Sequence, residues 1–549
     1  MAHTIRRRRT LGVLGTTAAA ALVLAGCAST GDTAALDGII IGTTDVITSL
    51  DPAGSYDNGS FAVQNQVFPF LMNSPYGSPD VEPDIAESAE FTAPTEYTVT
   101  LKEGLTFANG NELTSSDVKF TFDRQLAIAD PNGPSSLLYN LESTDAPDDL
   151  TVVFHLKSEN DQVFPQILSS PVSPIVDEEV FSATELTPSD EVVAGNGFAG
   201  QYSISDYAEN ELIQYEAFPD YNGVLGAAKT DSVTAQYFTD ETSLKLAVQE
   251  GDADVAFRSL TPTDLADLRD DENVTVYDGP GGEIRYIVFN FNTQPFGLQT
   301  PDADPAKALA VRQAIAGVID REQIASEVYN DTFTPLYSYV PDGLTGANES
   351  LKVYGDGQGG PDVEKAAATL QAAGVTTPVQ LNLQYNPDHY GNSSDEEYAL
   401  IQAQLNESGL FTVNLQSTLW DTYNPEYREG LYPLFQLGWY PDYSDADNYL
   451  TPFFLPTTDA DGNAVNGGFF ANGYNDPAVD QLILAQGEEA DPDARAALIE
   501  EIQTKVAEQV STLPYLQGAQ VAVARNDITG VETTLDPSFK FRYGALGRE

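Results

Sequence analysis

A strand and a helix follow one another in the stretch Tyr97-Thr98-Val99-Thr100-Leu101-Lys102-Glu103-Gly104, continued by Leu113-Thr114-Ser115-Ser116-Asp117-Val118. Apolar and polar side chains alternate over 97–101, which is typical of a half-buried strand, and the next three residues predict a turn. Thr114 then stands where a helix N-cap is expected, because an acid, Asp117, follows it three residues later. This order of elements indicates an α/β fold.

The same alternation continues along the chain. Apolar runs predict strands at 38–42, 201–204, 212–215 and 379–383. Helices are predicted at 241–249, 306–329, 362–373, 395–407 and 493–510, because each begins near an acid or a proline and Gly374 follows the third of them. We therefore expect a mixed α/β protein with at least two lobes.

Length and composition define the class of protein. A chain of 549 residues is too long for one hydrophobic core, and 42% hydrophobic with 10% aromatic residues can fill several cores without disulfides or metals. The formal net charge of −58 at pH 7 opposes binding to nucleic acid or to anionic lipid. We expect a globular protein with no nucleic-acid partner.

The N-terminus has the layout of an export signal. Four arginines at 6–9 precede an apolar stretch at 11–24, which is shorter than the roughly 20 residues that a membrane span needs. We therefore predict a cleaved signal peptide at 1–26. Because the pair Arg8-Arg9 lies within the run of arginines, the choice between general secretory and twin-arginine export stays open.

The chain has one cysteine, Cys27, which follows Leu24-Ala25-Gly26. This placement resembles the bacterial lipobox, and the resemblance implies that Cys27 carries a lipid and becomes the first residue of the mature protein. Such a lipid anchors a protein without spanning the membrane. The small polar residues after Cys27 then form a lipidated tether at 27–37.

Nucleotide and metal motifs are weak in this sequence. Gly195-Asn196-Gly197-Phe198-Ala199-Gly200 matches the letters G-x-G-x-x-G, but an expected strand follows where a dinucleotide site needs a helix, so a turn between strands is predicted. The segment 459–463 resembles a calcium loop but lacks its turn glycine and closing glutamate. His155 and His389 lie far apart without ligand spacing. We expect no metal and no cofactor.

Catalytic motifs are missing as well. The sequence contains no G-x-S-x-G, no H-E-x-x-H and no second cysteine. We therefore expect a protein that is not an enzyme. A secreted hydrolase that uses two acids such as Asp442 and Asp445 stays open as the alternative.

One segment combines aromatic and acidic side chains. The expected strand 434–439 runs into the loop Tyr440-Pro441-Asp442-Tyr443-Ser444-Asp445, directly after Trp439. Aromatic faces beside carboxylates suit an amphipathic ligand with a positive charge, because a ring offers apolar area while an acid neutralises the charge. The alternative is an acidic surface loop with Trp439 packed in the core.

Eight pieces in order along the chain match a known family. They are Ser49-Leu50-Asp51-Pro52; Pro83-Asp84-Ile85-Ala86-Glu87-Ser88; the stretch from Tyr97 to Val118; Gly195-Asn196-Gly197 with Pro219-Asp220-Tyr221; Ala247-Val248-Gln249-Glu250-Gly251-Asp252-Ala253-Asp254; Val311-Arg312-Gln313-Ala314-Ile315 with Ile319-Asp320-Arg321; 366–374; and the Trp439 segment. Together they resemble family 5 of the extracytoplasmic solute-binding proteins of ABC importers. That family carries oligopeptides, dipeptides and, in some members, nickel or oligosaccharides.

The resemblance implies a periplasmic-binding-protein-like α/β fold, with two lobes joined by a hinge and an additional inserted domain. Domain I would consist of 38–77, 196–284 and 511–549, domain II of 78–195, and domain III of 285–510. A ligand would be enclosed between domains I and III as they close.

The resemblance also implies site residues. Asp442, three residues after the tryptophan, would pair with the ligand's ammonium group. Gly438 and Tyr440 would offer backbone hydrogen bonds that end at Pro441, which has no N–H. The remaining expected ligand-binding residues are Trp439, Tyr443, Asn58 and Gly59, the last two from the loop 56–60. No Arg or His for the ligand's other end can be located from the sequence.

The expected function is therefore that of a lipid-anchored binding protein at the extracytoplasmic face of the bacterial cell membrane. It would capture a peptide or similar amphipathic solute, act as a monomer, and deliver its ligand to an ABC permease and ATPase complex. An oligosaccharide ligand is the first alternative. A sensor on the same scaffold is another.

Overall fold

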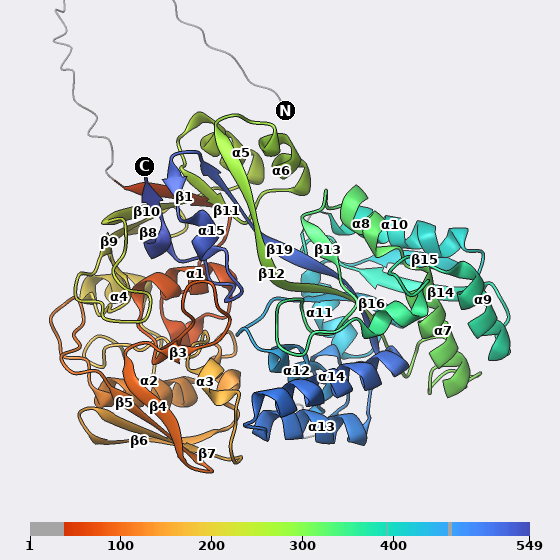
Figure 1. Cartoon of the computed structure of the whole chain (residues 1–549), viewed down its shortest axis with the longest axis horizontal. Helices are drawn as coiled ribbons and strands as arrows, with labels where there is room; N and C mark the ends of the chain where they lie inside the picture. The colour runs from red at the N-terminus through yellow and green to blue at the C-terminus, as the bar shows by residue number, and fades with distance from the viewer. Residues whose placement is uncertain (1–37, 392, 459–463) are drawn as a thin grey trace, which may run out of the picture. The chain divides into compact units, whose positions relative to one another are not determined.

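A mixed sheet joins segments from both ends of the computed structural model, which describes residues 38–391, 393–458 and 464–549 (Figure 1). Within those residues the sheet has eleven strands, and ten of them follow one another in hydrogen-bonded order. That order is β15 (Phe411–Ser417), β14 (Val379–Tyr385), β16 (Leu434–Trp439), β12 (Val274–Phe289), β19 (Thr512–Arg525), β11 (Val255–Phe257), β1 (Ile39–Thr43), β10 (Ser232–Tyr237), β9 (Leu212–Ala217) and β8 (Tyr202–Ala208). β13 (Phe333–Pro335) pairs with β19 off this path.

Two long antiparallel strands, β12 and β19, form the middle of this sheet (Figure 1). Val274 to Gly279 pair with one half of β19, and Glu283 to Val288 pair with the other half. A register shift separates the two halves, between Gly279 and Glu283. The first half of this pair lies next to β11, and the second half lies next to β16.

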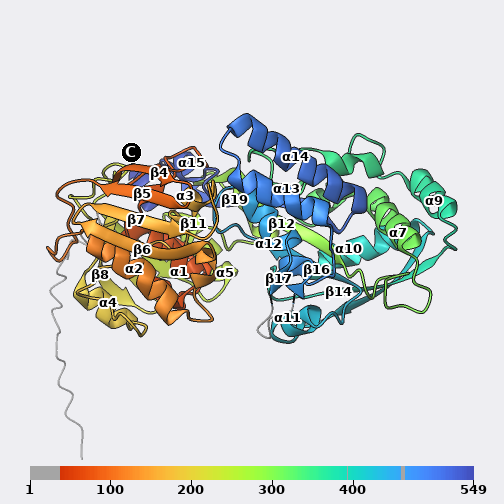
Figure 2. The same cartoon turned by 90° about the horizontal axis from the view of Figure 1, so that it is seen from below.

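A second, four-stranded antiparallel sheet consists of β4 (Ala86–Ala93), β5 (Glu96–Leu101), β7 (Thr151–Leu156) and β6 (Leu141–Asp148), in that order (Figure 2). Helix α2 (Ser115–Ile128) packs against β6 and β7. Short pairs complete the strands: β2 (Met72–Asn73) with β3 (Glu82–Pro83), β17 (Thr457–Thr458) with β18 (Ala464–Val465), and β20 (Ile528–Thr529) with β21 (Gly547–Arg548).

Helices cover these sheets. They are α1 (Asn58–Val67), α3 (Phe164–Ile167), α4 (Ser189–Gly195), α5 (Glu241–Glu250), α6 (Pro262–Arg269), α7 (Pro305–Val318), α8 (Arg321–Glu327), α9 (Val363–Ala372), α10 (Ser394–Glu407), α11 (Trp420–Arg428), α12 (Thr451–Phe454), α13 (Pro477–Glu488), α14 (Pro492–Gln509) and α15 (Val531–Thr534). The α/β fold class is confirmed.

Buried apolar side chains gather in three large clusters. One runs from Ile284 to Leu516, a second unites 39–68 with 176–257 and 522–546, and the third lies mainly within 71–175. All three lie within one compact unit, Gly38–Glu549. The division into domains I, II and III therefore stays a prediction. The expected signal peptide, the tether with Cys27 and the calcium-like segment 459–463 lie outside the described residues.

The expected start of α2 is confirmed. The Thr114 hydroxyl and the Asp117 carboxylate form a reciprocal capping box, in which the Thr114 backbone N–H donates to Asp117 at 2.9 Å. The backbone N–H groups of Thr114 and Asp117 therefore both have hydrogen-bond acceptors, which fixes where the helix begins.

Two expectations about elements are wrong. The helix predicted over 306–329 is divided into α7 and α8, because Ile319 is extended and Asp320 caps a new helix by accepting from the Gln323 N–H at 3.0 Å. The turn at 195–200 does not join two strands, since helix α4 precedes it and ends at Asn196 in a left-handed conformation.

Candidate functional site

Strand β16 lies between β12 and β14 and carries the aromatic and acidic loop at its end. It covers Leu434–Trp439, which confirms the expected strand. Its last residues, Gly438 and Trp439, pair with Arg285 and Ile284 of β12. The loop that follows therefore begins beside β12, one of the two long strands in the middle of the sheet.

Asp442 is held by three hydrogen bonds. Its N–H donates to Asn448 Oδ1 at 3.0 Å, and Asn448 Nδ2 donates to Asp442 Oδ2 at 3.2 Å. The hydroxyl of Tyr56 donates to Asp442 Oδ1 at 2.6 Å. Since 386 positions separate Tyr56 from Asp442, this bond joins the first and the third expected domains.

Asn448 also holds Trp439, whose Nε1–H donates to the same Asn448 Oδ1 at 2.9 Å. Asn448 is almost fully buried. The tryptophan ring meets Phe453 and Phe469 edge-on, with centroids 5.0 and 5.4 Å away. One buried amide thus positions both the indole and the carboxylate, a role that sequence reasoning missed because Asn448 belongs to no pattern.

A cavity of about 40 Å³ lies beside Asp442. Four of the expected site residues line it: Asn58, Tyr440, Asp442 and Tyr443. Its other walls come from Phe61, Ala62 and Asn65 of α1, from Phe257 and Arg258 at the end of β11, from Pro441, and from Ser538, Phe539, Lys540 and Phe541 near the C-terminus. This volume holds about one water molecule, so a larger ligand requires the walls to separate.

Gly59, Gly438 and Trp439 do not belong to the cavity lining. A Cβ at Gly59 would stand 2.1 Å from the backbone oxygen of Val46. A Cβ at Gly438 would stand 2.9 Å from the Tyr390 ring and 3.1 Å from Arg285 Nη1. Packing within the protein therefore accounts for both glycines. Asn58 and Gly59 belong to the first turn of α1, so the expected loop 56–60 is partly helical.

Gly59→Ala is expected to lower the free energy of unfolding by about 1–3 kcal/mol, because the added methyl group overpacks a backbone oxygen that cannot move freely. Thermal or urea denaturation measures the change. Gly487→Ala in α13 is the matched control, since no atom lies within 4 Å of the position that a Cβ would take there and alanine favours a helix. Equal effects of the two substitutions would contradict this account.

Tyr443 is buried and its hydroxyl donates to Asp447 Oδ2 at 3.1 Å. Its ring packs with the cluster of 71–175. The polar group of Tyr443 is therefore engaged within the protein, and what remains for a ligand is its ring.

Two charged side chains at the cavity, Asp442 and Lys540, have shifted pKa values. Burial raises the pKa of Asp442 to about 6, against the hydrogen bonds from Tyr56 and Asn448, which act to lower it. Burial also lowers the pKa of Lys540 to about 7, and the charge of Arg542 adds to this effect. Lys540 Nζ has three acceptors: Ser169 Oγ at 2.6 Å, the Ser169 carbonyl at 2.7 Å and Asn73 Oδ1 at 3.2 Å.

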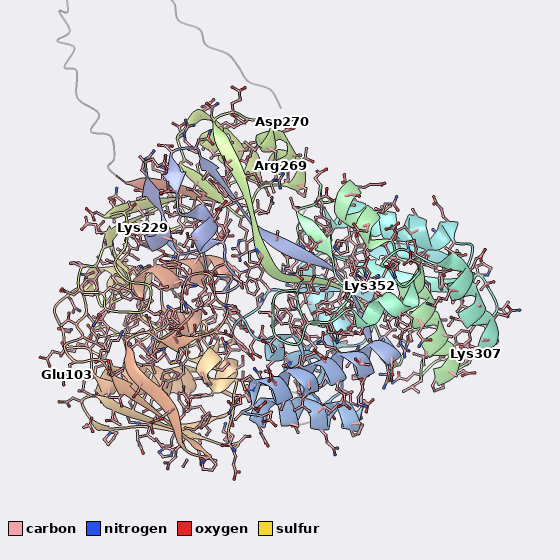
Figure 3. All side chains as sticks on the ribbon, viewed as in Figure 1. Glu103, Lys229, Arg269, Asp270, Lys307 and Lys352 are labelled. Atoms are coloured by element: carbon pink, nitrogen blue, oxygen red, sulfur yellow. The ribbon has the colours of Figure 1, made fainter. Side chains whose placement is uncertain are left out.

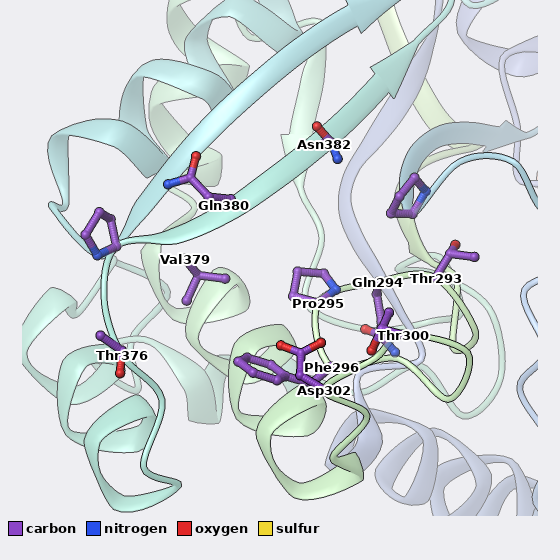
Figure 4. A pocket seen from close by; sticks show the side chains of 12 residues that line it. Thr293, Gln294, Pro295, Phe296, Thr300, Asp302, Thr376, Val379, Gln380 and Asn382 are labelled. Atoms are coloured by element: carbon purple, nitrogen blue, oxygen red, sulfur yellow. The ribbon is translucent and has the colours of Figure 1, made fainter.

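A larger hollow of about 350 Å³ lies between β14 and the segment that follows β12 (Figure 4). Gln294, Phe296 and Asp302 face Gln380 and Asn382 across it. None of the expected site residues lines this hollow. The cavity beside Asp442 is therefore the candidate site despite its smaller volume.

The described part of the chain offers neither a metal-ligand cluster nor a membrane-spanning helix. In residues 38–391, 393–458 and 464–549, no three His, Cys, Asp or Glu side chains are grouped as metal ligands. Within the same residues, no helix has the length and apolar character that a bilayer crossing requires.

Comparisons with known proteins extend over most of the chain. Heme-binding protein A of Haemophilus influenzae is 27% identical over 536 residues, which cover 91% of this chain and 92% of that relative. The probable D,D-dipeptide-binding periplasmic protein DdpA of Escherichia coli is 25% identical over 443 residues, or 79% of this chain and 80% of its own. Both are named as binding proteins.

A solved structure shares the fold. The ABC transporter-associated periplasmic binding protein DppA from Helicobacter pylori, in complex with the peptide STSA, superposes with a TM-score of 0.72 at 19% identity. The likeness covers 93% of this chain and 98% of that one. This confirms the periplasmic-binding-protein-like fold.

The family model described as bacterial extracellular solute-binding proteins, family 5 Middle, matches residues 80–461. This match spans more than half of the chain and agrees with the resemblance drawn from its motifs. The chain belongs to the family 5 bacterial extracellular solute-binding proteins.

Proposed function

We propose that this protein captures short peptides outside the cell membrane and delivers them to an ABC permease and its ATPase. The observation that carries the proposal is the Asp442 carboxylate, fixed by Asn448 beside Trp439 at a cavity between distant segments of the chain. A carboxylate next to aromatic rings suits the free ammonium group of a peptide. The names of DdpA and of the peptide-bound DppA support the same ligand class.

The proposal includes a lipid anchor at Cys27, with the tether 27–37 leading to the folded part, and a monomer at the extracytoplasmic face of the membrane. Domain I (38–77, 196–284 and 511–549) and domain III (285–510) would separate to admit a ligand and close around it. Closure would present one shape to the permease. The cavity of about 40 Å³ agrees with a closed form.

The hydrogen bonds that already occupy the Asp445 carboxylate favour binding without catalysis over the hydrolase alternative. Its two carboxylate oxygens accept from Arg495 Nη2 at 2.7 Å and from Nη1 at 2.8 Å. It also caps the short helix at 446–449 by accepting from the Asp447 N–H at 2.8 Å. An acid that is occupied in this way does not serve with Asp442 as an acid/base couple.

Mass spectrometry of the molecules that co-purify with the protein tests the ligand class, and the same instrument shows whether Cys27 carries a lipid. Calorimetry with a mixed peptide pool, with its N-acetylated form, with oligosaccharides and with haem then compares the candidates. We expect the free peptides to bind with a Kd of about 1 μM or lower, about −8 kcal/mol. Binding of sugars or haem without any peptide would contradict the proposal, as would recovery of cleaved peptides.

The peptide affinity is expected to be highest near pH 7 and to fall about tenfold for each pH unit below about 6. Burial raises the pKa of Asp442 to about 6, and the protonated carboxyl has no charge with which to hold an ammonium group. Above about pH 8 the affinity falls again, because the α-amino group of the peptide loses its proton. Calorimetry at pH 5, 6, 7 and 8 measures this profile.

N-acetylated peptides are the control for that profile, since they carry no ammonium group. Their weaker affinity should not follow the titration at pH 6. A profile that is the same for free and acetylated peptides would show that Asp442 does not contact the amino terminus.

A further inference from the structure

The hollow at the start of β14 has the size of a ligand pocket. Its volume is about 350 Å³. Sites for small molecules commonly measure roughly 300–1,000 Å³. Its walls come from the segment 293–302, from 376–382 and from Pro433 (Figure 4). No residue lines both this hollow and the cavity beside Asp442, so a ligand bound here leaves that cavity free.

Two buried polar groups in the wall of the hollow have no hydrogen-bond partner among the described residues. Gln294 is only 1% exposed, and its Oε1 is unpaired. The Oγ1 of the neighbouring Thr293 is unpaired as well. Buried polar groups nearly always have a partner, so two unpaired ones at a hollow indicate that a partner binds there. The terminal torsion of a glutamine is broad, and a small rotation brings this amide to a ligand in the hollow.

The first half of β14 offers a free backbone edge to the hollow. The Val379 N–H donates to the Leu410 carbonyl at 2.9 Å, on the side of β15. Because successive residues of a strand direct their backbone groups to opposite edges, Gln380 and Asn382 direct theirs away from β15. On that side β16 pairs with β14 only at 383–384. Within the described residues, no strand therefore takes up the backbone N–H and C=O groups of Gln380 and Asn382.

Phe296 is held at the hollow in an unusual backbone conformation. Its φ of 60° lies in the left-handed region, which an aromatic residue rarely adopts. Its carbonyl accepts from the Asp304 N–H at 3.0 Å, and the next N–H, of Gly297, donates to the Gln294 carbonyl at 2.8 Å. The ammonium group of Lys307 on α7 (Figure 3) lies over the ring, 5.5 Å from its centroid. Backbone strain of this kind is concentrated at ligand sites.

The chemistry of the lining favours a neutral ligand that is rich in hydroxyl groups. A hydroxyl both donates and accepts, so it matches the unpaired N–H and C=O groups as well as the side chains. An anion would find no counter-charge, because no Lys, Arg or His lines the hollow. The ring of Phe296 offers an apolar face to the C–H groups of a sugar. The polar lining side chains are amides, hydroxyls and one acid: Gln294, Gln380, Asn382, Thr293, Thr300, Thr376 and Asp302.

We infer that the hollow between β14 and the segment 293–302 is a second binding site, which takes a neutral sugar unit. The sugar hydroxyls pair with the amide of Gln294 and with the free edge of β14, and the ring of Phe296 covers an apolar face. This inference goes beyond the proposed peptide capture and does not depend on it. The ligand is a free sugar or one unit of a polysaccharide, since both present the same groups.

Saturation-transfer NMR and calorimetry with the full-length protein test the inference. The probes are glucose, N-acetylglucosamine, the tetramers maltotetraose and chitotetraose, and glucuronate as the anionic comparison. We expect at least one neutral sugar to bind with a Kd of about 1 mM or lower. Glucuronate should bind about tenfold more weakly than glucose, because its charge is buried without a partner. A tetramer that binds no more tightly than its monomer identifies a free sugar as the ligand, and a tighter tetramer identifies a polysaccharide.

Two substitutions probe the wall of the hollow. Gln294→Met keeps the length of the side chain and removes its amide, and Gln380→Ala truncates an exposed side chain at the free edge. Each should weaken the sugar about 3- to 10-fold, the effect of one lost hydrogen bond. Because Gln294 Oε1 has no partner in the protein, Gln294→Met should not lower the melting temperature. Gln299→Ala is the matched control, since Gln299 is exposed on the same segment and does not line the hollow.

The outcomes separate this second site from the peptide site. If no sugar binds, or if both variants bind the sugar as the wild type does, the inference is wrong while peptide capture stands. Competition between a sugar and a peptide pool would place the sugar in the cavity beside Asp442 and would also overturn the inference. A lower melting temperature of Gln294→Met, together with full sugar affinity of Gln380→Ala, would show that the amide of Gln294 is structural. Sugar binding without any peptide binding would contradict the proposed function alone.

Discussion

Asp442→Asn is expected to weaken the binding of peptides with a free amino terminus by about 30-fold or more. Truncating one partner of a hydrogen-bonded charge pair in an interface costs about 2–5 kcal/mol. Asparagine keeps the shape of the side chain, and its oxygen can still accept from Tyr56. What it removes is the negative charge. Calorimetry with free and N-acetylated forms of one peptide pool measures the loss.

The acetylated peptides provide the internal comparison, since they should lose little affinity on the same substitution. Asp421→Asn is the external control, because Asp421 is exposed on α11 and lies outside the cavity lining. Loss of both peptide forms to the same degree would mean that the substitution disturbs the loop rather than the charge pair.

Asp51→Ala is expected to lower the free energy of unfolding by about 3–5 kcal/mol, since it leaves a buried guanidinium without its carboxylate. Arg124 donates from Nη1 to Asp51 Oδ1 at 2.8 Å and from Nη2 to Oδ2 at 2.5 Å. Both side chains are buried, and the Thr187 N–H adds a third bond to Asp51 at 2.7 Å. Urea denaturation of the ligand-free protein measures the change.

Asp123→Ala is the matched control, because Asp123 lies on α2 beside Arg124. Asp123 pairs with Lys119 at 2.6 Å, but both side chains are about half exposed, so its removal should cost at most about 1 kcal/mol. A double variant, Asp51→Ala with Arg124→Met, should recover part of the loss because no charge is left buried. Similar losses from Asp51→Ala and Asp123→Ala would contradict the assignment.

The elements that local patterns define were predictable. Alternation placed the strand at 97–101 correctly, the expected strand 434–439 is present, and the acid three residues after Thr114 marked the start of α2. The break between α7 and α8 was missed because the apolar pattern continues across Ile319. The N-cap at Asp320 nevertheless starts a new helix. The ends of helices are therefore hard to predict where a capping residue interrupts an apolar pattern that continues.

The site was only partly predictable, because its contacts join distant positions. The Trp439 segment itself signals an aromatic and acidic loop, and the family resemblance singled out Asp442. Arg258 carries no signal of its own, since its pairing with Asp45 spans 213 positions and its conformation is left-handed after a buried strand. Tyr56 meets Asp442 across 386 positions. Such pairings follow from the tertiary fold and not from spacing.

The contact between the Tyr56 hydroxyl and the Asp442 carboxylate has a consequence for selectivity. An arriving ammonium group does not meet a vacant oxygen, because it must displace or share a phenol that already satisfies it. The observed affinity is therefore the difference between two competing interactions and is lower than the ammonium contact alone would give. A neutral molecule offers nothing stronger than the phenol, so the internal hydroxyl acts as a threshold that only a full positive charge exceeds.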